Sequence, residues 1–246
     1  MRPHGVVTLA AVPDLVVAPA KLTRRLRITG VRGDGYHLLD AEMVSLDLAD
    51  TLTFADGDGL EARGSYAEVP VGEDNLVRRA LRLVDRAALV TLDKRIPPGA
   101  GLGGGSADAA AVLRWAGVDD LELAAHLGAD VPFCLRGGRA RVTGVGEHLE
   151  PLPFEPLTFT LLTPPIHCST PAVYGAWDGL GGPTADGPND LEPAALIVLP
   201  ELAEWRDRLA DLTGQTPMLA GSGSTWFVEG AHEGDGLLVV HTVPAT

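Results

Sequence analysis

The chain has 246 residues, of which 46% are hydrophobic, so it is long enough to bury a sizeable core as one large domain or two lobes. Its 33 acidic residues outnumber its 19 basic residues, and the formal net charge of -14 argues against a nucleic-acid or anionic-membrane partner. The two cysteines, Cys134 and Cys168, lack metal or redox spacing and indicate a reducing compartment.

The N-terminal segment superficially resembles a secretory signal. An apolar stretch at residues 6–12 follows Arg2 and precedes the small-residue segment 18–20. Pro13 interrupts this stretch and one arginine is a thin basic region, so we expect a cytoplasmic protein. No run approaches the roughly 20 apolar residues that span a bilayer. Residues 1–17 are expected to add one strand or nothing.

Extended segments are predicted next. In residues 16–30, Leu22, Leu26 and Ile28 fall on one face of a strand. The turn-forming residues 30–35 then lead to a tyrosine and a histidine, whose flat face and polar edges suit binding of a base, with a buried strand position as the alternative.

The sequence next predicts a β-hairpin and a helix. Two strands within residues 41–60 flank a hairpin-type turn at residues 56–59. Residues 76–88 repeat apolar side chains at helical spacing, and Asn75 is a favoured N-cap. The sequence therefore predicts a helix that begins directly after Asn75.

The most informative stretch is Ile-Pro-Pro-Gly-Ala-Gly-Leu-Gly-Gly-Gly-Ser-Ala-Asp-Ala-Ala-Ala, residues 96–111. Five glycines in seven residues let the backbone turn tightly and come close to a ligand. Ser106 is a favoured N-cap for a helix over residues 107–116. Because a helix start carries unpaired N–H groups and a partial positive charge, the stretch predicts a phosphate-binding loop. A plain flexible loop before a helix is the alternative.

Two common phosphate-binding loops fit poorly. A Walker loop needs a lysine after its last glycine, whereas Ser106 follows here. Gly99, Gly101 and Gly104 match the dinucleotide fingerprint, but that fingerprint must follow a buried parallel strand. Residues 90–98 are half charged and end in two prolines, so a dinucleotide-binding fold is disfavoured.

Shorter elements complete the chain. Gly117 is a natural helix stop, and Asp119 is close to a capping box for a helix over residues 121–127. Asp130 lies between this helix and an expected strand, where an aspartate is usually a turn former. Residues 137–144 continue as a hairpin.

The last third of the chain is expected to form a second lobe. Residues 159–163 are predicted to form a strand, and a later helix is expected to bury Ala203, Leu209 and Leu212. Only residues 229–236 separate the last two predicted strands.

The glycine-rich stretch resembles the ATP loop of the GHMP kinases, whose signature is Pro-x-x-x-Gly-Leu-Gly-Ser-Ser-Ala. Further segments resemble motifs of this family in the family's order, over roughly residues 16–245. They are Ala18-Pro19-Ala20-Lys21-Leu22, Asp34-Gly35-Tyr36-His37, Asn75-Leu76-x-x-Arg79-Ala80, Gly128-Ala129-Asp130-Val131-Pro132-Phe133, Ser169-Thr170-Pro171-Ala172-Val173-Tyr174, Asn189-Asp190-Leu191-Glu192-Pro193 and Leu219-Ala220-Gly221-Ser222-Gly223. Their combination is far more specific than one glycine loop.

The resemblance implies the two-lobed α+β GHMP kinase fold. A ribosomal-protein-S5-like N-terminal lobe with the ATP site would cover residues 1–152, and a ferredoxin-like C-terminal lobe residues 153–246. ATP and substrate would bind in the cleft between the lobes. A helix normally lies between the last two strands of the family, so the short connection here is consistent with a trimmed second lobe.

The resemblance also implies the roles of the catalytic and ATP-binding residues. Asp130 would accept the proton of the reacting hydroxyl, and Lys21 would keep it charged and orient it. Mg²⁺ would share the phosphate charge, but its ligands are not readable from the sequence. The implied ATP-binding residues are Asn75, Pro98, Gly99, Ala100, Gly101, Leu102, Gly103, Gly104, Gly105 and Ser106.

The Asp-Gly-Tyr-His segment resembles the branch of the family that acts on a cytidyl diphosphate small molecule. The implied substrate-binding residues are Thr23, Tyr36, His37, Tyr174, Gly221 and Ser222. Thr23 and Arg24 depart from the family's asparagine and leucine, which leaves the substrate and the turnover open.

The resemblance therefore implies ATP-dependent phosphorylation of a hydroxyl in non-mevalonate isoprenoid precursor synthesis, by a monomer or homodimer. A GHMP kinase for another small alcohol and a catalytically silent nucleotide-binding relative remain alternatives. A dinucleotide-dependent oxidoreductase is the most distant one.

Overall fold

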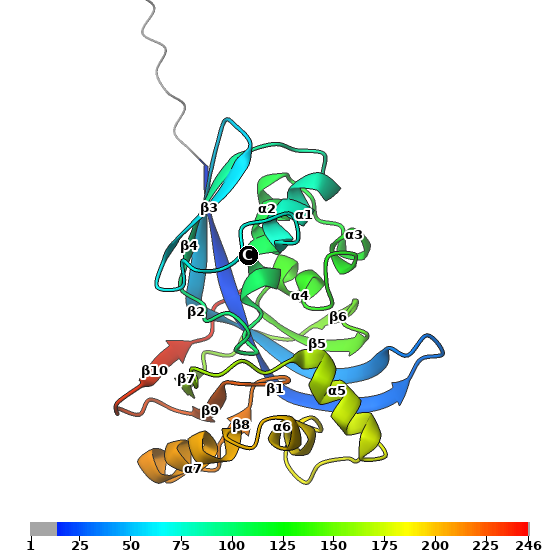
Figure 1. Ribbon diagram of the computed structural model, residues 1–246, viewed down its shortest axis with the longest axis vertical. Helices are drawn as coiled ribbons and strands as arrows, with labels where there is room; N and C mark the ends of the chain where they lie inside the picture. Colours follow the sequence, from blue (N-terminus) through cyan, green and yellow to red (C-terminus); the bar gives the residue numbers. More distant parts are fainter. Residues whose placement is uncertain (1–13, 246) are drawn as a thin grey trace, which may run out of the picture.

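The structure is a computed structural model that describes residues 14–245, and within this range the strands form two β-sheets (Figure 1). The first sheet has the order β3-β4-β2-β5-β6, with β1 paired to β2. Its strands are β1 (Asp14–Val31), β2 (His37–Ala55), β3 (Gly59–Gly64), β4 (Leu89–Lys94), β5 (Arg139–Gly144) and β6 (His148–Pro151). One strand or nothing was expected over residues 1–17; residues 14–17 begin β1, and residues 1–13 lie outside the described residues.

Helices α1 (Leu76–Leu83), α2 (Gly104–Trp115), α3 (Leu121–Ala125) and α4 (Val131–Arg136) gather beside the first sheet (Figure 1). Helix α2 packs against β1, β2, α1 and α4. Its alanines at 107 and 109–111 are fully buried, because small side chains let a helix approach neighbouring elements closely. This packing fixes the start of α2, where the glycine loop ends.

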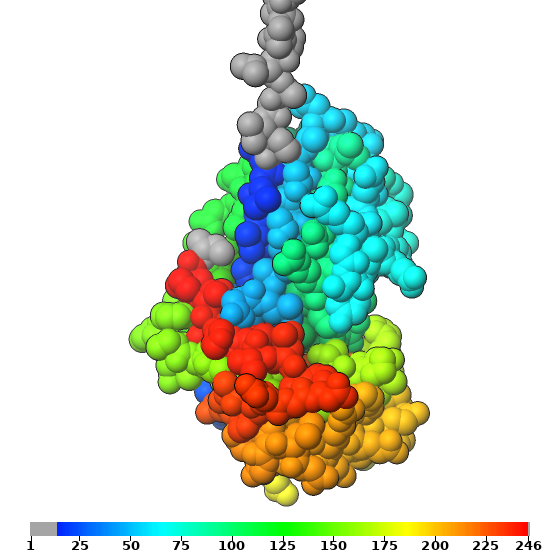
Figure 2. Space-filling view, turned by 90° about the vertical axis from the view of Figure 1, so that its left-hand side faces the viewer, coloured from blue at the N-terminus to red at the C-terminus, as the bar shows by residue number. Residues whose placement is uncertain are grey.

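The second sheet has the order β10-β7-β9-β8. Its strands are β7 (Thr158–Leu162), β8 (Met218–Leu219), β9 (Trp226–Glu229) and β10 (Leu237–His241), accompanied by helices α5 (Thr170–Gly179), α6 (Glu192–Val198) and α7 (Leu202–Thr213). After β10 the chain returns to the first sheet, where Thr242 bridges Leu46 and Ala245 bridges Gly137. In the space-filling view this red C-terminal segment lies between the first-sheet residues and the orange residues of α7 (Figure 2).

The β1–β2 hairpin belongs to both halves of the molecule. Leu22 and Leu46 are buried in the core of the first sheet, whereas Leu26, further along β1, packs in the second core with Trp226. Shifts in the β1–β2 register follow Pro19, Thr23 and Ile28, and such bulges re-aim side chains along a strand. One strand therefore carries residues to the boundary between the two sheets.

Several predicted boundaries were wrong for local reasons. Helix α2 begins at Gly104, not after Ser106, because Gly103 takes the left-handed φ of 69° and its carbonyl accepts from the Ala107 amide. The Asp120 carboxylate, not that of Asp119, caps α3 by accepting from the Leu123 amide. A helix, α4, follows Asp130 in place of the expected strand.

Three further predictions were also wrong. Strands β2 and β3 do not form a hairpin; β4 lies between them, antiparallel to β2 and parallel to β3. Val90 and Leu92 of β4 are buried, which explains its interior position. Helix α1 ends at Leu83, because Asp85 adopts a left-handed φ of 50°. In α7, Leu202 is buried instead of Leu212.

Other expectations were confirmed. Asn75 caps α1 by accepting from the Val77 amide, and Gly117 takes a left-handed φ of 72° just beyond α2. Strand β7 lies within one residue of the predicted 159–163. Between β9 and β10 the structure has no helix, as the short connection predicted. None of the helices in residues 14–245 is both long and apolar enough to cross a membrane.

Candidate active site

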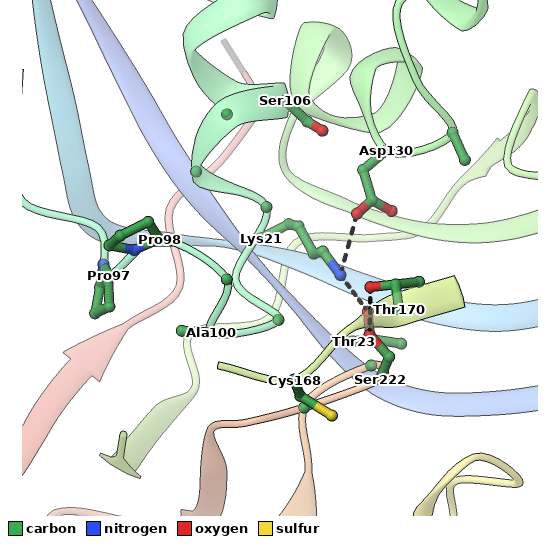
Figure 3. Close-up of a pocket in the computed structure, with 18 of the residues that line it drawn as sticks. Lys21, Thr23, Pro97, Pro98, Ala100, Ser106, Asp130, Cys168, Thr170 and Ser222 are labelled. Carbon is green, nitrogen blue, oxygen red and sulfur yellow. Dashed lines mark hydrogen bonds and ion pairs between the residues drawn. The ribbon is translucent and has the colours of Figure 1, made fainter. Parts of the chain in front are cut away.

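A cavity of about 640 Å³ lies where the two sheets meet, and this volume suits a small-molecule ligand. Its lining comes from β1, the glycine loop, the start of α2, the start of α4, α5 and the turn before β9 (Figure 3). The lining residues used below are Lys21, Thr23, Asn75, Gly101, Gly103, Ser106, Asp108, Asp130, His167, Thr170, Tyr174 and Ser222.

The glycine loop is held by backbone contacts from both sheets. The Lys21 amide donates to the Leu102 carbonyl at 3.0 Å, and the Thr225 amide donates to the Ala100 carbonyl at 3.1 Å. Gly101 has a φ of 79°, and a Cβ there would lie 2.3 Å from the Ala220 carbonyl oxygen. Only glycine fits this position, because both the backbone conformation and the available space exclude a side chain.

The start of α2 opens into the cavity. Gly104, Gly105 and Ser106 line it, and the first N–H groups of a helix have no partner within the helix. A Cβ on Gly103 would lie 2.6 Å from Lys21 Cγ, so the lysine side chain runs directly beneath the loop. The bare backbone and the positive end of the helix fit a phosphate group.

Lys21 and Asp130 meet in the cavity, as Figure 3 shows. Lys21 Nζ lies 3.3 Å from Asp130 Oδ2 and donates to Thr23 Oγ1 at 3.2 Å. Lys21 is only 5% exposed, whereas the Asp130 side chain stays accessible and makes no capping hydrogen bond to α4. A carboxylate beside a buried ammonium can accept a proton while the ammonium holds it in place.

The turn at residues 221–223 forms the opposite wall. Ser222 Oγ lies 2.8 Å from Thr170 Oγ1 at the start of α5. Asn189 fixes this turn, since its Nδ2 donates to the carbonyls of Leu219 at 2.9 Å and Gly221 at 2.7 Å. The motif that begins at Asn189 therefore acts on the site through the backbone of the turn.

Asp190, the next residue of that motif, is also buried. Its carboxylate accepts from the Arg27 guanidinium at 2.6 Å and from the amides of Ile28 and Ala185 at 2.9 Å. These bonds tie β1 to the loop before α6. The sequence singled out the motif, but it could not give these partners.

The expected substrate residues fall into two groups. Thr23, Tyr174, Gly221 and Ser222 line the cavity. His37 lies just behind this lining, with its ring centroid 4.7 Å from that of Tyr174. Tyr36 is 61% exposed, does not line the cavity and has the Arg32 guanidinium 5.5 Å from its ring. Burial raises the pKa of the Tyr174 phenol, so this hydroxyl stays protonated and can donate.

Of the expected ATP-binding residues, Asn75 and the loop residues 98–101 and 103–106 line the cavity, whereas the Leu102 side chain is buried in the core. Asn75 lines the cavity while its side chain caps α1, so a binding role and a capping role are compatible. The sequence did not point to His167, whose ring lies where a Cβ on Gly99 would be. Cys168, noted only for its spacing, also lines the cavity.

The sequence analysis also did not predict a buried cluster of charged side chains, formed by Lys94, Asp50 and Asp108 next to the glycine loop. Lys94 Nζ lies 2.9 Å from Asp108 Oδ2 and also bonds the Asp50 carboxylate. Burial is the main cause that raises the pKa of Asp108 to about 7. Asp108 Oδ1 has no hydrogen-bond partner among the residues that the structure describes. Lys94 shares a strand face with the buried Val90 and Leu92, and this period of two was the available signal.

This cluster predicts a pH-dependent stability effect. A carboxyl with a raised folded pKa binds more protons when folded than when unfolded between pH 3.8 and about 7. Asp108 therefore lowers the free energy of unfolding as the pH rises through that window. Asp108→Asn should gain on the order of 2 kcal/mol relative to wild type between pH 5 and pH 8. Urea unfolding at both pH values measures the gain, and parallel pH profiles would contradict it.

Arg24 does not line the cavity. Its guanidinium lies 2.7 Å from Glu42 and 2.9 Å from Glu229, and its Cζ lies 5.7 Å from the ring centroid of Phe159. Arg24 thus joins β1 and β2 to β9 of the second sheet. Its departure from the family's leucine is explained by this ion cluster and need not concern the substrate.

Arg24→Leu should therefore change kcat and KM by no more than about twofold, the effect expected of a change outside the binding surface. It should lower the free energy of unfolding, because Glu229 loses its partner. Steady-state kinetics and urea unfolding check both parts. A large rise in KM with unchanged stability would place Arg24 in the substrate site after all.

A glycine loop at a helix start, facing a lysine–aspartate pair in one cavity, is the arrangement of a phosphotransferase that acts on an alcohol. Residues 75–138 match the family described as GHMP kinases N terminal domain. A 4-diphosphocytidyl-2-C-methyl-D-erythritol kinase from Paracoccus denitrificans is 42% identical to this chain. The alignment covers 85% of this chain and 84% of the relative. A protein of the same name from Ruegeria pomeroyi is 40% identical, and that alignment covers 85% of this chain and 86% of the relative.

A solved structure agrees with these relatives. The crystal structure of a 4-(cytidine 5'-diphospho)-2C-methyl-D-erythritol kinase superimposes with a TM-score of 0.75 at 35% identity, and the match covers 93% of this chain and 99% of that one. The chain therefore belongs to the 4-diphosphocytidyl-2-C-methyl-D-erythritol kinase family of the GHMP kinases, which are ATP-dependent kinases of small molecules.

Proposed function

We propose that the protein transfers the γ-phosphoryl group of ATP to the 2-hydroxyl of 4-diphosphocytidyl-2-C-methyl-D-erythritol, a step in non-mevalonate isoprenoid precursor synthesis. The observation that carries this proposal is the contact between Lys21 and Asp130 beside the glycine loop. The names of its relatives support the choice of substrate.

The ATP phosphates would lie against the backbone of residues 99–106, with the adenosine toward Asn75. The left-handed glycines and the open start of α2 support this placement. Among residues 14–245 there is no group of three His, Cys, Asp or Glu side chains that could hold a metal ion. Mg²⁺ commonly takes one or two protein oxygens together with phosphates, and the Ser106 hydroxyl, which lines the cavity at the start of α2, suits it. When bound, it would neutralise developing phosphate charge.

In the reaction, the Asp130 carboxylate would accept the proton of the 2-hydroxyl. Lys21 would hold this carboxylate and offer its remaining N–H bonds to the developing negative charge. Thr23 would orient Lys21 by accepting its hydrogen bond, so its effect on the substrate would be partly indirect. Ser222 and Gly221, fixed by Asn189, would line the path between the two ligands.

The cytidine end would lie by Tyr174, His37 and Tyr36. Flat aromatic faces can stack on a base, and polar ring edges can bond its heteroatoms. Holding the far end of the substrate makes the reaction at the near end effectively intramolecular. In this proposal Tyr36, which is exposed at the tip of the β1–β2 hairpin, would meet the base only once it is bound.

The proposal extends to the organisation of the chain. Residues 1–152 would form the ATP-binding lobe and residues 153–246 the second lobe, although the hairpin contributes to both cores. We expect a cytoplasmic monomer or homodimer without a nucleic-acid partner, in line with its net charge of -14.

ADP release tests the function. The protein with Mg·ATP should turn over 4-diphosphocytidyl-2-C-methyl-D-erythritol at roughly 1–100 s⁻¹. Matched reactions with homoserine, with mevalonate and without acceptor separate the alternatives. Turnover of another alcohol alone would identify a different GHMP kinase. ATP binding without turnover of any acceptor would indicate a silent relative, and hydride transfer to a dinucleotide would reject the kinase.

A further inference from the structure

A buried aspartate holds the start of the glycine loop. The Asp50 carboxylate, on β2, is fully buried, and its Oδ1 accepts from the backbone amide of Arg95 and, at 2.8 Å, from that of Ile96. These two residues follow directly after β4 and lead into the glycine-rich stretch. Asp50 thus fixes the place where the chain leaves the sheet and enters the loop.

The other oxygen of Asp50 reaches the far end of the loop through Lys94. Asp50 Oδ2 bonds the Lys94 ammonium, which also donates to Asp108 Oδ2 at 2.9 Å. Asp108 lies in the second turn of α2, the helix into which the loop leads, and its Oδ1 has no hydrogen-bond partner within residues 14–245. Lys94 therefore links the helix at one end of the loop to the strand at the other.

This charged cluster lies directly beneath the start of α2. A Cβ added to Gly104, the first residue of the helix, would lie 2.8 Å from Lys94 Nζ. Gly104 and Gly105 line the cavity with bare backbone. N–H groups of such a backbone bind a phosphate only when they point at it, so a loop whose two ends are held in advance binds more tightly than a loose one.

The charged cluster cannot attract phosphate by its charge. It sets two carboxyl groups against one ammonium, so it carries no net positive charge. A carboxylate close to the loop opposes an anionic ligand. Any favourable effect of Asp50 on phosphate binding must therefore come from where it holds the loop. Attraction by charge and positioning of the loop predict opposite results when the charge of Asp50 is removed.

We infer that Asp50 is a positioning residue for phosphate binding: by fixing both ends of the glycine loop, it keeps the N–H groups at the start of α2 directed at the phosphates of ATP. Asp50 does not line the cavity, so it acts through the backbone that does. The inference rests on the proposed placement of ATP at this loop, which it deepens.

Asp190 provides a control that is matched in burial and bonding. Like Asp50, it is a buried carboxylate that accepts from one cation, Arg27, and from two backbone amides, those of Ile28 and Ala185. It holds the loop before α6 and does not line the cavity. Asp50→Asn and Asp190→Asn should lower the free energy of unfolding by similar amounts, because each leaves a cation without its ionised partner.

Direct binding of Mg·ATP, measured by isothermal titration calorimetry, is the first arm of the test, because it needs neither acceptor nor turnover. Asp50→Asn should raise the Kd about tenfold, the cost of a loop that must be ordered on binding. Asp190→Asn should leave it within about twofold. An unchanged or lower Kd in Asp50→Asn would overturn the inference, since loss of a negative charge alone lowers the Kd. Equal rises in both variants would also overturn it, because they indicate lost stability alone.

The second arm begins with wild type, so it does not require that a variant folds. Hydrogen exchange followed by NMR reports the protection of the Arg95 and Ile96 amides without ATP. Both should be protected before ATP is added, because Asp50 already holds them. Asp50→Asn should exchange them faster, and Asp190→Asn should not. Free exchange in wild type that becomes protected only with ATP would overturn the inference.

The two arms separate this inference from the proposed function. If Asp50→Asn weakens ATP binding as expected but wild type does not phosphorylate 4-diphosphocytidyl-2-C-methyl-D-erythritol, the choice of substrate has failed and the role of Asp50 stands. If wild type phosphorylates this substrate and Asp50→Asn binds ATP as tightly as wild type, the function stands and the inference has failed.

Discussion

Asp130→Asn is expected to lower kcat by about 10²–10⁴-fold, the range of a lost general base, with little change in ATP affinity. The amide keeps the shape of the carboxylate but cannot take the proton of the acceptor hydroxyl. Because Asp130 makes no capping bond to α4, the substitution should not disturb that helix. ADP release at saturating substrate gives kcat, and titration with ATP gives the affinity.

Asp120→Asn provides the control for this first prediction. Asp120 also stands at a helix N-cap, where asparagine caps as well as aspartate, and it lies outside the cavity lining. It should retain wild-type kinetics. A loss of less than tenfold in Asp130→Asn would remove this residue as the base.

Lys21→Met should lower kcat by about 10²–10³-fold, the typical cost of removing one donor that stabilises a transition state. Methionine fills a similar volume beneath the glycine loop but cannot bond Asp130 or Thr23. The buried ammonium is 3.3 Å from Asp130, so its loss also leaves that carboxylate without its partner. Stopped-flow or quenched-flow phosphate transfer in a single turnover measures the chemical step directly.

The double variant Lys21→Met, Asp130→Asn decides whether the two residues act together. Residues that work as one unit are strongly non-additive, so the double variant should be about as slow as the slower single variant. Multiplied losses would show two independent contributions. In that case the contact between Lys21 and Asp130 would not be the centre of the mechanism.

Composition located the glycine loop, and the family resemblance implied that Lys21 and Asp130 are a catalytic pair, which stays a prediction. Local rules also predicted the Asn75 cap, the Gly117 stop and most of the elements. The structure added the contacts that these rules cannot reach, because they join distant segments. Thr23 was expected to meet the substrate, and in the structure its hydroxyl also accepts a hydrogen bond from Lys21.

The remaining misses share a physical cause. The position of β4 between β2 and β3 depends on which strand buries its side chains most completely when it lies in the interior of the sheet. This is a property of the whole sheet and not of one segment. Lys94 meets Asp50 and Asp108 only after β2, β4 and α2 have packed, so its spacing alone gave no cluster. Asp178 Oδ1 contacts His37 Nε2 across most of the chain, and no motif in the sequence singled it out.

Product analysis tests the central claim most directly. The protein would be incubated with Mg·ATP and 4-diphosphocytidyl-2-C-methyl-D-erythritol labelled with ¹³C at carbon 2, and the products followed by ³¹P and ¹³C NMR. The account predicts a new phosphate monoester signal coupled to the labelled carbon, in equal amount to the ADP formed. Release of inorganic phosphate alone, or a phosphate on a different hydroxyl, would contradict it.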